Sequence, residues 1–195
     1  MDTEKELRDI KKVSIPVDRL HYQYIHNVTP TELWNNDMSI LNSPHVEMLK
    51  TIIKYGFDWK VLFETRYTKE RILRREKGMK QWTDEHIKKH ITWRFEVLKS
   101  LKKHGYNKKK HQYPVRVLKI PFWTSRFSFN RDWLVGPEIW DGGGRCAAAC
   151  VLGWKEIPCV LCEDLRPGSM DKGEFDDKLK KIEGAWNEVI PTISA

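Results

Sequence analysis

Three glycines followed by an arginine are the residues of this chain best suited to bind an anion: Gly142, Gly143, Gly144 and Arg145. Glycine adopts positive φ without steric cost, so the chain can turn sharply here. Backbone N–H groups are then left uncovered where a helix is expected to begin, which favours a phosphate. The guanidinium group of Arg145 adds a planar, permanent charge. We therefore expect an anion site at this glycine turn; the alternative is a tight turn beside a solvated arginine.

The elements that position the glycine turn follow from its neighbours in the sequence. Ile139 and Trp140 end an apolar segment that is typical of a strand. Strong helix formers, including three alanines, occupy residues 145–152, and Gly153 is suited to end that helix. A short apolar run at residues 157–161 predicts a further strand. The expected order is strand, glycine turn, helix and strand.

These residues resemble the phosphate-binding motif of the ParB/sulfiredoxin superfamily. The motif stands here as Asp141-Gly-x-x-Arg-x-Ala-Ala, followed by Leu152-Gly-x-x-x-Ile-Pro. Three upstream segments are similar to the opening strand, the first core helix and the following strand of that family: residues 15–20, 43–56 and 113–117. The resemblance extends over residues 13–63 and 113–163.

The resemblance implies an α+β fold, a small mixed sheet with flanking helices. It places one ParB/sulfiredoxin-like domain at residues 13–163, with a helical insertion at residues 64–112. Residues 1–12 are then expected to form a mobile lead-in. The remaining residues, 164–195, are expected to form a tail whose apolar stripe predicts one helix at residues 174–186.

Capping residues predict the ends of two helices. Ser43 and Pro44 are suited to begin a helix that Gly56 ends. Thr83 is suited to cap a longer helix in the insertion, which Gly105 ends.

Side chains that the superfamily uses for chemistry are missing from the glycine turn. Sulfiredoxins carry a catalytic cysteine and a histidine where this chain has Gly143 and Gly144, so repair of sulfinic acids is not expected. The CTP-dependent partition proteins have a glutamate and an arginine there, and the tail after Asp164 is too short for their DNA-reading domain. Free-serine kinases of the superfamily usually have histidines there. The resemblance implies that phosphate binding is retained and that catalytic side chains come from elsewhere.

The activity that the resemblance implies is an NTP-dependent phosphotransferase or NTPase using ATP or CTP and Mg²⁺. Asp141 is a candidate catalytic residue and the nearest carboxylate for the metal. Asp18, His45 and Glu47 are candidates for the catalytic acid or base, because the resemblance brings their segments near the glycine turn. His45 equally fits an exposed residue at a helix end. Nucleotide contacts are expected from Gly142, Gly143, Gly144, Arg145, Cys146 and Arg126.

Arg126 belongs to a segment, residues 121–133, in which aromatic residues alternate with arginines. Such a segment is suited to stack a base and neutralise phosphates. Aromatic packing under a loop is the alternative interpretation.

A lysine-rich stretch at the end of the insertion supports a different function: Lys102, Lys103, Lys108, Lys109 and Lys110. Such a stretch can contact the phosphate backbone of DNA or RNA, with an affinity that falls as salt rises. The alternative is a solvated helix end, where lysines suit the helix dipole. The second hypothesis is therefore a nucleic-acid-binding accessory protein. A ParB-like nuclease ranks last, because carboxylates do not cluster in the sequence.

Composition narrows the class of protein. The length of 195 residues, a hydrophobic fraction of 40% and nine tryptophans favour one folded domain. A net charge of +8 is compatible with a nucleotide or nucleic-acid partner, and a homodimer is left open. The sequence has no apolar run of about 18 residues and begins without the apolar core of a secretory signal. We therefore expect a cytoplasmic protein with no membrane partner.

The four cysteines are Cys146, Cys150, Cys159 and Cys162. Because side chains alternate along a strand, Cys159 and Cys162 are expected on opposite sides, which disfavours a zinc site. We interpret the cysteines as small buried side chains in a reducing compartment.

Overall fold

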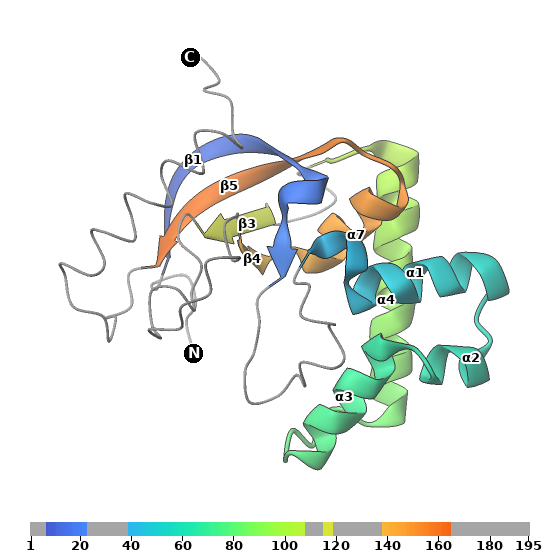
Figure 1. The fold of residues 1–195 in the computed structure, drawn as a ribbon. Coiled ribbons are helices and arrows are strands. Elements are labelled where there is room, and N and C mark those ends of the chain that lie inside the picture. Colours follow the sequence, from blue (N-terminus) through green and yellow to red (C-terminus); the bar gives the residue numbers. More distant parts are fainter. Residues whose placement is uncertain (1–6, 23–38, 108–114, 119–137, 165–195) are drawn as a thin grey trace.

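The computed structural model of the chain describes residues 7–22, 39–107, 115–118 and 138–164. In these ranges a five-stranded sheet lies on one side of helix α7 (Gly143–Val151), and the longer helices pack on its other sides (Figure 1). This arrangement confirms the predicted α+β class.

The sheet is mixed, with the strand order β1-β5-β3-β4-β2. β1 (Leu7–Pro16) pairs antiparallel with β5 (Glu156–Asp164), which pairs parallel with β3 (Val115–Leu118). β3 pairs antiparallel with β4 (Glu138–Asp141), and β4 pairs parallel with the short β2 (His21–Tyr22). Since β4 runs directly into the glycine turn, the sheet fixes where that turn lies.

The first strand starts earlier than the sequence predicts. β1 begins at Leu7, which pairs with Asp164 of β5, so the prediction of a mobile lead-in is wrong for residues 7–12. These residues are mostly charged and polar, and they form no apolar run that would indicate a strand. Backbone hydrogen bonds to β5, which any residue type can make, keep them in the sheet.

The described ranges also contain the helices α1 (Pro44–Tyr55), α2 (Trp59–Phe63), α3 (Arg66–Glu76) and α4 (Asp84–His104). The side chains of Ser43 and Thr83 cap α1 and α4, each accepting a hydrogen bond from a backbone N–H three residues on. Gly56 and Gly105 follow these helices with φ of 68° and 61°. The predicted beginnings and ends of both helices are confirmed.

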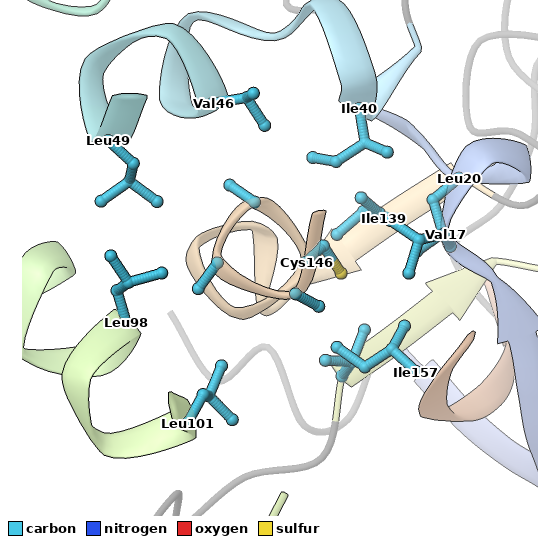
Figure 2. Close-up of a cluster of buried hydrophobic side chains, with 14 of the residues drawn as sticks. Val17, Leu20, Ile40, Val46, Leu49, Leu98, Leu101, Ile139, Cys146 and Ile157 are labelled. Carbon is cyan, nitrogen blue, oxygen red and sulfur yellow. The ribbon is translucent and has the colours of Figure 1, made fainter. Parts of the chain in front are cut away.

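Helix α7 lies at the centre of the hydrophobic core (Figure 2). Figure 2 shows Leu49 of α1 and Leu98 of α4 facing α7 from two sides, with Ile157 of β5 facing it from the sheet. α7 presents small buried side chains to these neighbours, namely Cys146, Ala147, Ala148 and Ala149. Small side chains let two helices and the sheet approach closely, and this packing holds the beginning of α7 in place.

Strand β5 is buried on both faces. Ile157 and Cys159 belong to the main core, whereas Val160 and Cys162 pack with Trp140 in a separate cluster. This confirms that Cys159 and Cys162 point to opposite sides. All four cysteines of the chain are free thiols, and burial raises the pKa of Cys159 to about 12. Cys159 therefore stays protonated and acts as an apolar side chain.

The predicted insertion is continuous with the core. Tyr67 of α3 and both Ile87 and Ile91 of α4 are fully buried in the main cluster. The tail helix predicted at residues 174–186 lies outside the described residues. Within the described ranges, no helix is long and apolar enough to cross a membrane.

Candidate functional site

The glycine turn has the geometry that requires its first glycine. Gly142 has φ of 93° and ψ of 15°, and its carbonyl accepts a hydrogen bond from Arg145 N–H at 2.8 Å. A Cβ at this position would lie 2.9 Å from Val115 Cγ2. The backbone N–H groups of Gly143 and Gly144 lie in the first turn of the helix, before its first intrahelical hydrogen bonds, and the N-cap residue Gly142 has no side chain to cap them.

Arg145 folds back over the glycine turn. Its Nη2 atom would lie 2.9 Å from a Cβ at Gly142 and is 3.7 Å from Asp141 Oδ2. The other carboxylate oxygen, Asp141 Oδ1, accepts a hydrogen bond from Gly142 N–H at 2.7 Å. Asp141 thus orders the turn and steadies the guanidinium group above it. The predicted grouping of Asp141 and Arg145 with the three glycines is present in the structure.

A second arginine, which the sequence interpretation missed, reaches the same turn from α4. A Cβ at Gly144 would lie only 2.1 Å from Arg94 Nη1, so the Arg94 guanidinium occupies the space beside that glycine. Arg94 falls between Ile91 and Leu98 on the buried stripe of α4. A cation within an apolar stripe was the one signal in the sequence that could have indicated a role for Arg94.

Tyr67 of α3 holds Arg94 in position. Arg94 Nε donates a hydrogen bond to the Tyr67 hydroxyl at 3.1 Å, and that hydroxyl lies 3.1 Å from His90 Nδ1. Burial lowers the pKa of His90 to about 4, with further contributions from Arg94 and Arg71. A neutral His90 can accept the Tyr67 proton, which leaves the Tyr67 oxygen to accept from Arg94.

Tyr67 is itself fixed from two sides. The Arg71 guanidinium carbon lies 3.5 Å from the centre of the Tyr67 ring, and the His45 ring packs edge-on at 4.8 Å. Arg71 pairs with the buried carboxylate of Glu70, which also binds Arg74. A tyrosine fixed in this way can fix its hydrogen-bonded partner.

Positive charge predominates at the glycine turn. A helix N-terminus carries roughly half an elementary positive charge, and Arg94 and Arg145 place two guanidinium groups against the first residues of α7. The carboxylate of Asp141 offsets one of these charges. Like charges held this close repel one another, so the arrangement favours an anion that carries several negative charges.

The three residues predicted as catalytic acids or bases lie at different places in the fold, and of these His45 packs against Tyr67, which binds Arg94. Asp18 lies in the 3-10 turn Val17–Arg19 and lines a hollow with Cys150 and Trp154, beyond the other end of α7. The carboxylate of Glu47 forms an ion pair with Arg66. The expected placement of Asp18 near the glycine turn is therefore wrong, because the segment that follows β1 lies at the C-terminal end of α7.

Glu47 and His45 have structural surroundings instead. Besides the ion pair, Glu47 Oε1 accepts a hydrogen bond from Arg66 N–H at 3.1 Å, which joins α1 to the start of α3. The His45 side chain is 5% exposed, so the interpretation as an exposed residue at a helix end is wrong. Burial lowers the pKa of His45 well below its ordinary value, and nearby Arg94 and Arg71 lower it further.

Cys146 does not face the predicted nucleotide site. Its side chain is fully buried in the core, and burial raises the pKa of the thiol well above its ordinary value. The predicted nucleotide contact is therefore wrong, since a helix turns by about 100° per residue and Cys146 faces inward where Arg145 faces the turn. Arg126 lies outside the described residues.

The lysine stretch is only partly described. Lys102 and Lys103 are exposed in the last turn of α4, where a positive charge stabilises the helix dipole. The other three candidates, Lys108, Lys109 and Lys110, lie outside the described residues.

The turn offers limited protein ligands for a metal. In the part of the chain that the structure describes, no group of three or more histidine, cysteine or acidic side chains could hold an ion. Asp141 supplies one carboxylate beside the turn. One carboxylate suits Mg²⁺ when phosphate oxygens and water complete its shell.

Comparison of the chain with protein-family models, with curated proteins and with solved structures finds no match in any of the three.

Proposed function

We propose that this chain is a nucleotide-binding protein of the ParB/sulfiredoxin type that acts as an NTP-dependent phosphotransferase or NTPase. One observation carries the proposal: the guanidinium groups of Arg94 and Arg145 both lie against the glycine turn that begins α7. Two permanent cations at a helix N-terminus suit the charge of a di- or triphosphate better than that of a single carboxylate.

The residues at the glycine turn would have different roles in binding a nucleotide. The N–H groups of Gly143 and Gly144 are suited to donate to phosphate oxygens, and the two arginines neutralise charge that grows during phosphoryl transfer. Asp141 would hold Mg²⁺ together with the phosphates, and the metal would supply further charge neutralisation. Tyr67 keeps Arg94 extended toward the turn.

The order of elements supports the proposed type. An opening strand, β1, is followed by α1, then by β3, and finally by β4, the glycine turn, α7 and β5. This is the order that the sequence resemblance implies. The helices α3 and α4 come between α1 and β3, where the insertion is expected, and α4 brings Arg94 to the turn.

The test is a panel of ATP, CTP, GTP and UTP, each with and without Mg²⁺, measured by thermal shift and by calorimetry. A ligand at 100 times its dissociation constant stabilises the folded state by about 2.7 kcal/mol. We expect saturable binding of at least one nucleotide that Arg145→Ala abolishes. Arg75→Ala is the matched control, because Arg75 pairs with Asp84 on the surface of α3 and α4. Absence of heat and of stabilisation with all four nucleotides would overturn the proposal.

A further inference from the structure

Trp93 is a large apolar side chain left in solvent beside the proposed phosphate site. It is 55% exposed, on the turn of α4 that also carries Arg94. The Arg94 guanidinium carbon lies 5.3 Å from the centre of the Trp93 ring, and the His90 ring packs edge-on against it at 5.6 Å. The edge of the half-buried His90 ring and the Arg94 cation thus orient the indole of Trp93, which remains open on its exposed side.

One guanidinium group links this indole to the glycine turn. Arg94 Nη1 occupies the space beside Gly144, while the same guanidinium group lies within cation–π range of Trp93. Among the described residues, Arg94 also faces the ring of Tyr67, which is fully buried and cannot meet a ligand from solvent. Of these two rings beside Arg94, Trp93 is therefore the one that a molecule bound at the turn could reach.

We propose that Trp93 stacks on the base of a nucleoside polyphosphate whose phosphates bind at the glycine turn, with Arg94 contacting both parts. This inference rests on the proposed function and deepens it, because it names the residue that contacts the base, the part of a nucleotide that an inorganic polyphosphate lacks. Stacking on an aromatic ring tolerates any base, since every base has a π face. Trp93 therefore adds affinity for a base without selecting strongly among ATP, CTP, GTP and UTP.

Three other exposed apolar side chains of the described residues lie elsewhere. Ile53 and Tyr55 belong to the end of α1, and Phe57 follows it. Phe57 contacts Phe95, which points away from Trp93, because residues two apart on a helix lie about 200° apart. Tyr55, which is 52% exposed, therefore serves as a matched control for the loss of an exposed aromatic ring.

The experiment compares ATP with inorganic tripolyphosphate, both with Mg²⁺, by calorimetry on the full chain. The variants are Trp93→Ala, Trp93→Phe, Arg94→Ala and Tyr55→Ala. We expect Trp93→Ala to weaken ATP binding about tenfold and to leave tripolyphosphate binding unchanged. Trp93→Phe should retain most of the ATP affinity, Arg94→Ala should weaken both ligands, and Tyr55→Ala should affect neither.

The outcomes separate the two proposals. If Trp93→Ala leaves ATP binding intact, or weakens both ligands equally, the stacking role is overturned and the phosphate site stands. If the unaltered chain binds tripolyphosphate as tightly as ATP, the base adds nothing and the stacking role is again overturned. If it binds neither ligand, nor any other nucleotide of the panel, both proposals fail.

Discussion

Arg94 Nη1 lies where a side chain at Gly144 would begin: a Cβ there would be 2.1 Å from that nitrogen. The two residues are far apart in the sequence and meet because α4 packs along α7. The absence of a side chain at Gly144 therefore makes room for a cation at the start of α7. The glycine turn and the inserted helices are parts of one site.

Replacing Gly144 should displace Arg94 without unfolding the protein. In Gly144→Ala the obstructing atom is the far end of a flexible side chain, so Arg94 can move, and alanine is favoured over glycine in a helix by about 0.5–1 kcal/mol. We expect near-unchanged stability in urea and a nucleotide affinity close to that of Arg94→Ala. The double variant should bind no worse than either single one; additive losses would contradict a shared mechanism.

Replacing Gly142 should instead cost stability. Gly142→Ala forces an alanine to adopt φ of 93° and places its Cβ 3.1 Å from Val115 Cα, a backbone atom that cannot move aside cheaply. We expect a loss of about 2 kcal/mol or more in the free energy of unfolding. Gly153→Ala is the control, because Gly153 also has positive φ but has open space around it. Equal losses in both variants would show that contact with Val115 contributes nothing.

Glu47 should prove structural rather than catalytic. In Glu47→Gln the ion pair with Arg66 is lost while the side chain keeps its shape. Because both side chains are partly exposed, we expect a loss of only about 1 kcal/mol in stability. Nucleotide binding and any turnover should be unchanged, measured at a temperature where both proteins are folded. A loss of turnover at unchanged stability would return Glu47 to the catalytic candidates.

Local sequence patterns allowed much of the fold to be predicted. Of the site, they indicated Asp141, the three glycines and Arg145, but not Arg94. The caps at Ser43 and Thr83 and the turn at Gly142 depend on residues only a few positions apart, so their sequence signals are sufficient. Arg94 could not be assigned in this way, because its role depends on how α4 packs against α7. The position of Arg94 within the apolar stripe of α4 could have indicated a role for this residue, but not which residue it contacts.

Order along the chain also says little about which end of an element a residue approaches. The sequence predicts Asp18 beside the glycine turn, because the resemblance brings its segment near that turn. The structure places it with Cys150 and Trp154 instead, beyond the C-terminal end of α7. The nine residues of α7 separate these ends by about 13 Å. A resemblance that brings segments together therefore does not bring every side chain in them to the same site.

His90 should make stability and the position of Arg94 sensitive to acid. Burial and the nearby cations Arg94 and Arg71 lower its pKa from 6.5 to about 4 in the folded chain. The unfolded state therefore binds the proton more readily, so this contribution to stability is present above pH 6.5 and is lost as the pH falls toward 4. Protonation also leaves Nδ1, which lies 3.1 Å from the Tyr67 hydroxyl, unable to accept a hydrogen bond from it. We expect the urea midpoint to fall between pH 7 and pH 5, and to fall less in His90→Asn, whose amide does not titrate. Parallel pH profiles for the two proteins would show that His90 is not responsible, since groups common to both, such as the buried His45 and the carboxylates, would then explain the whole decline.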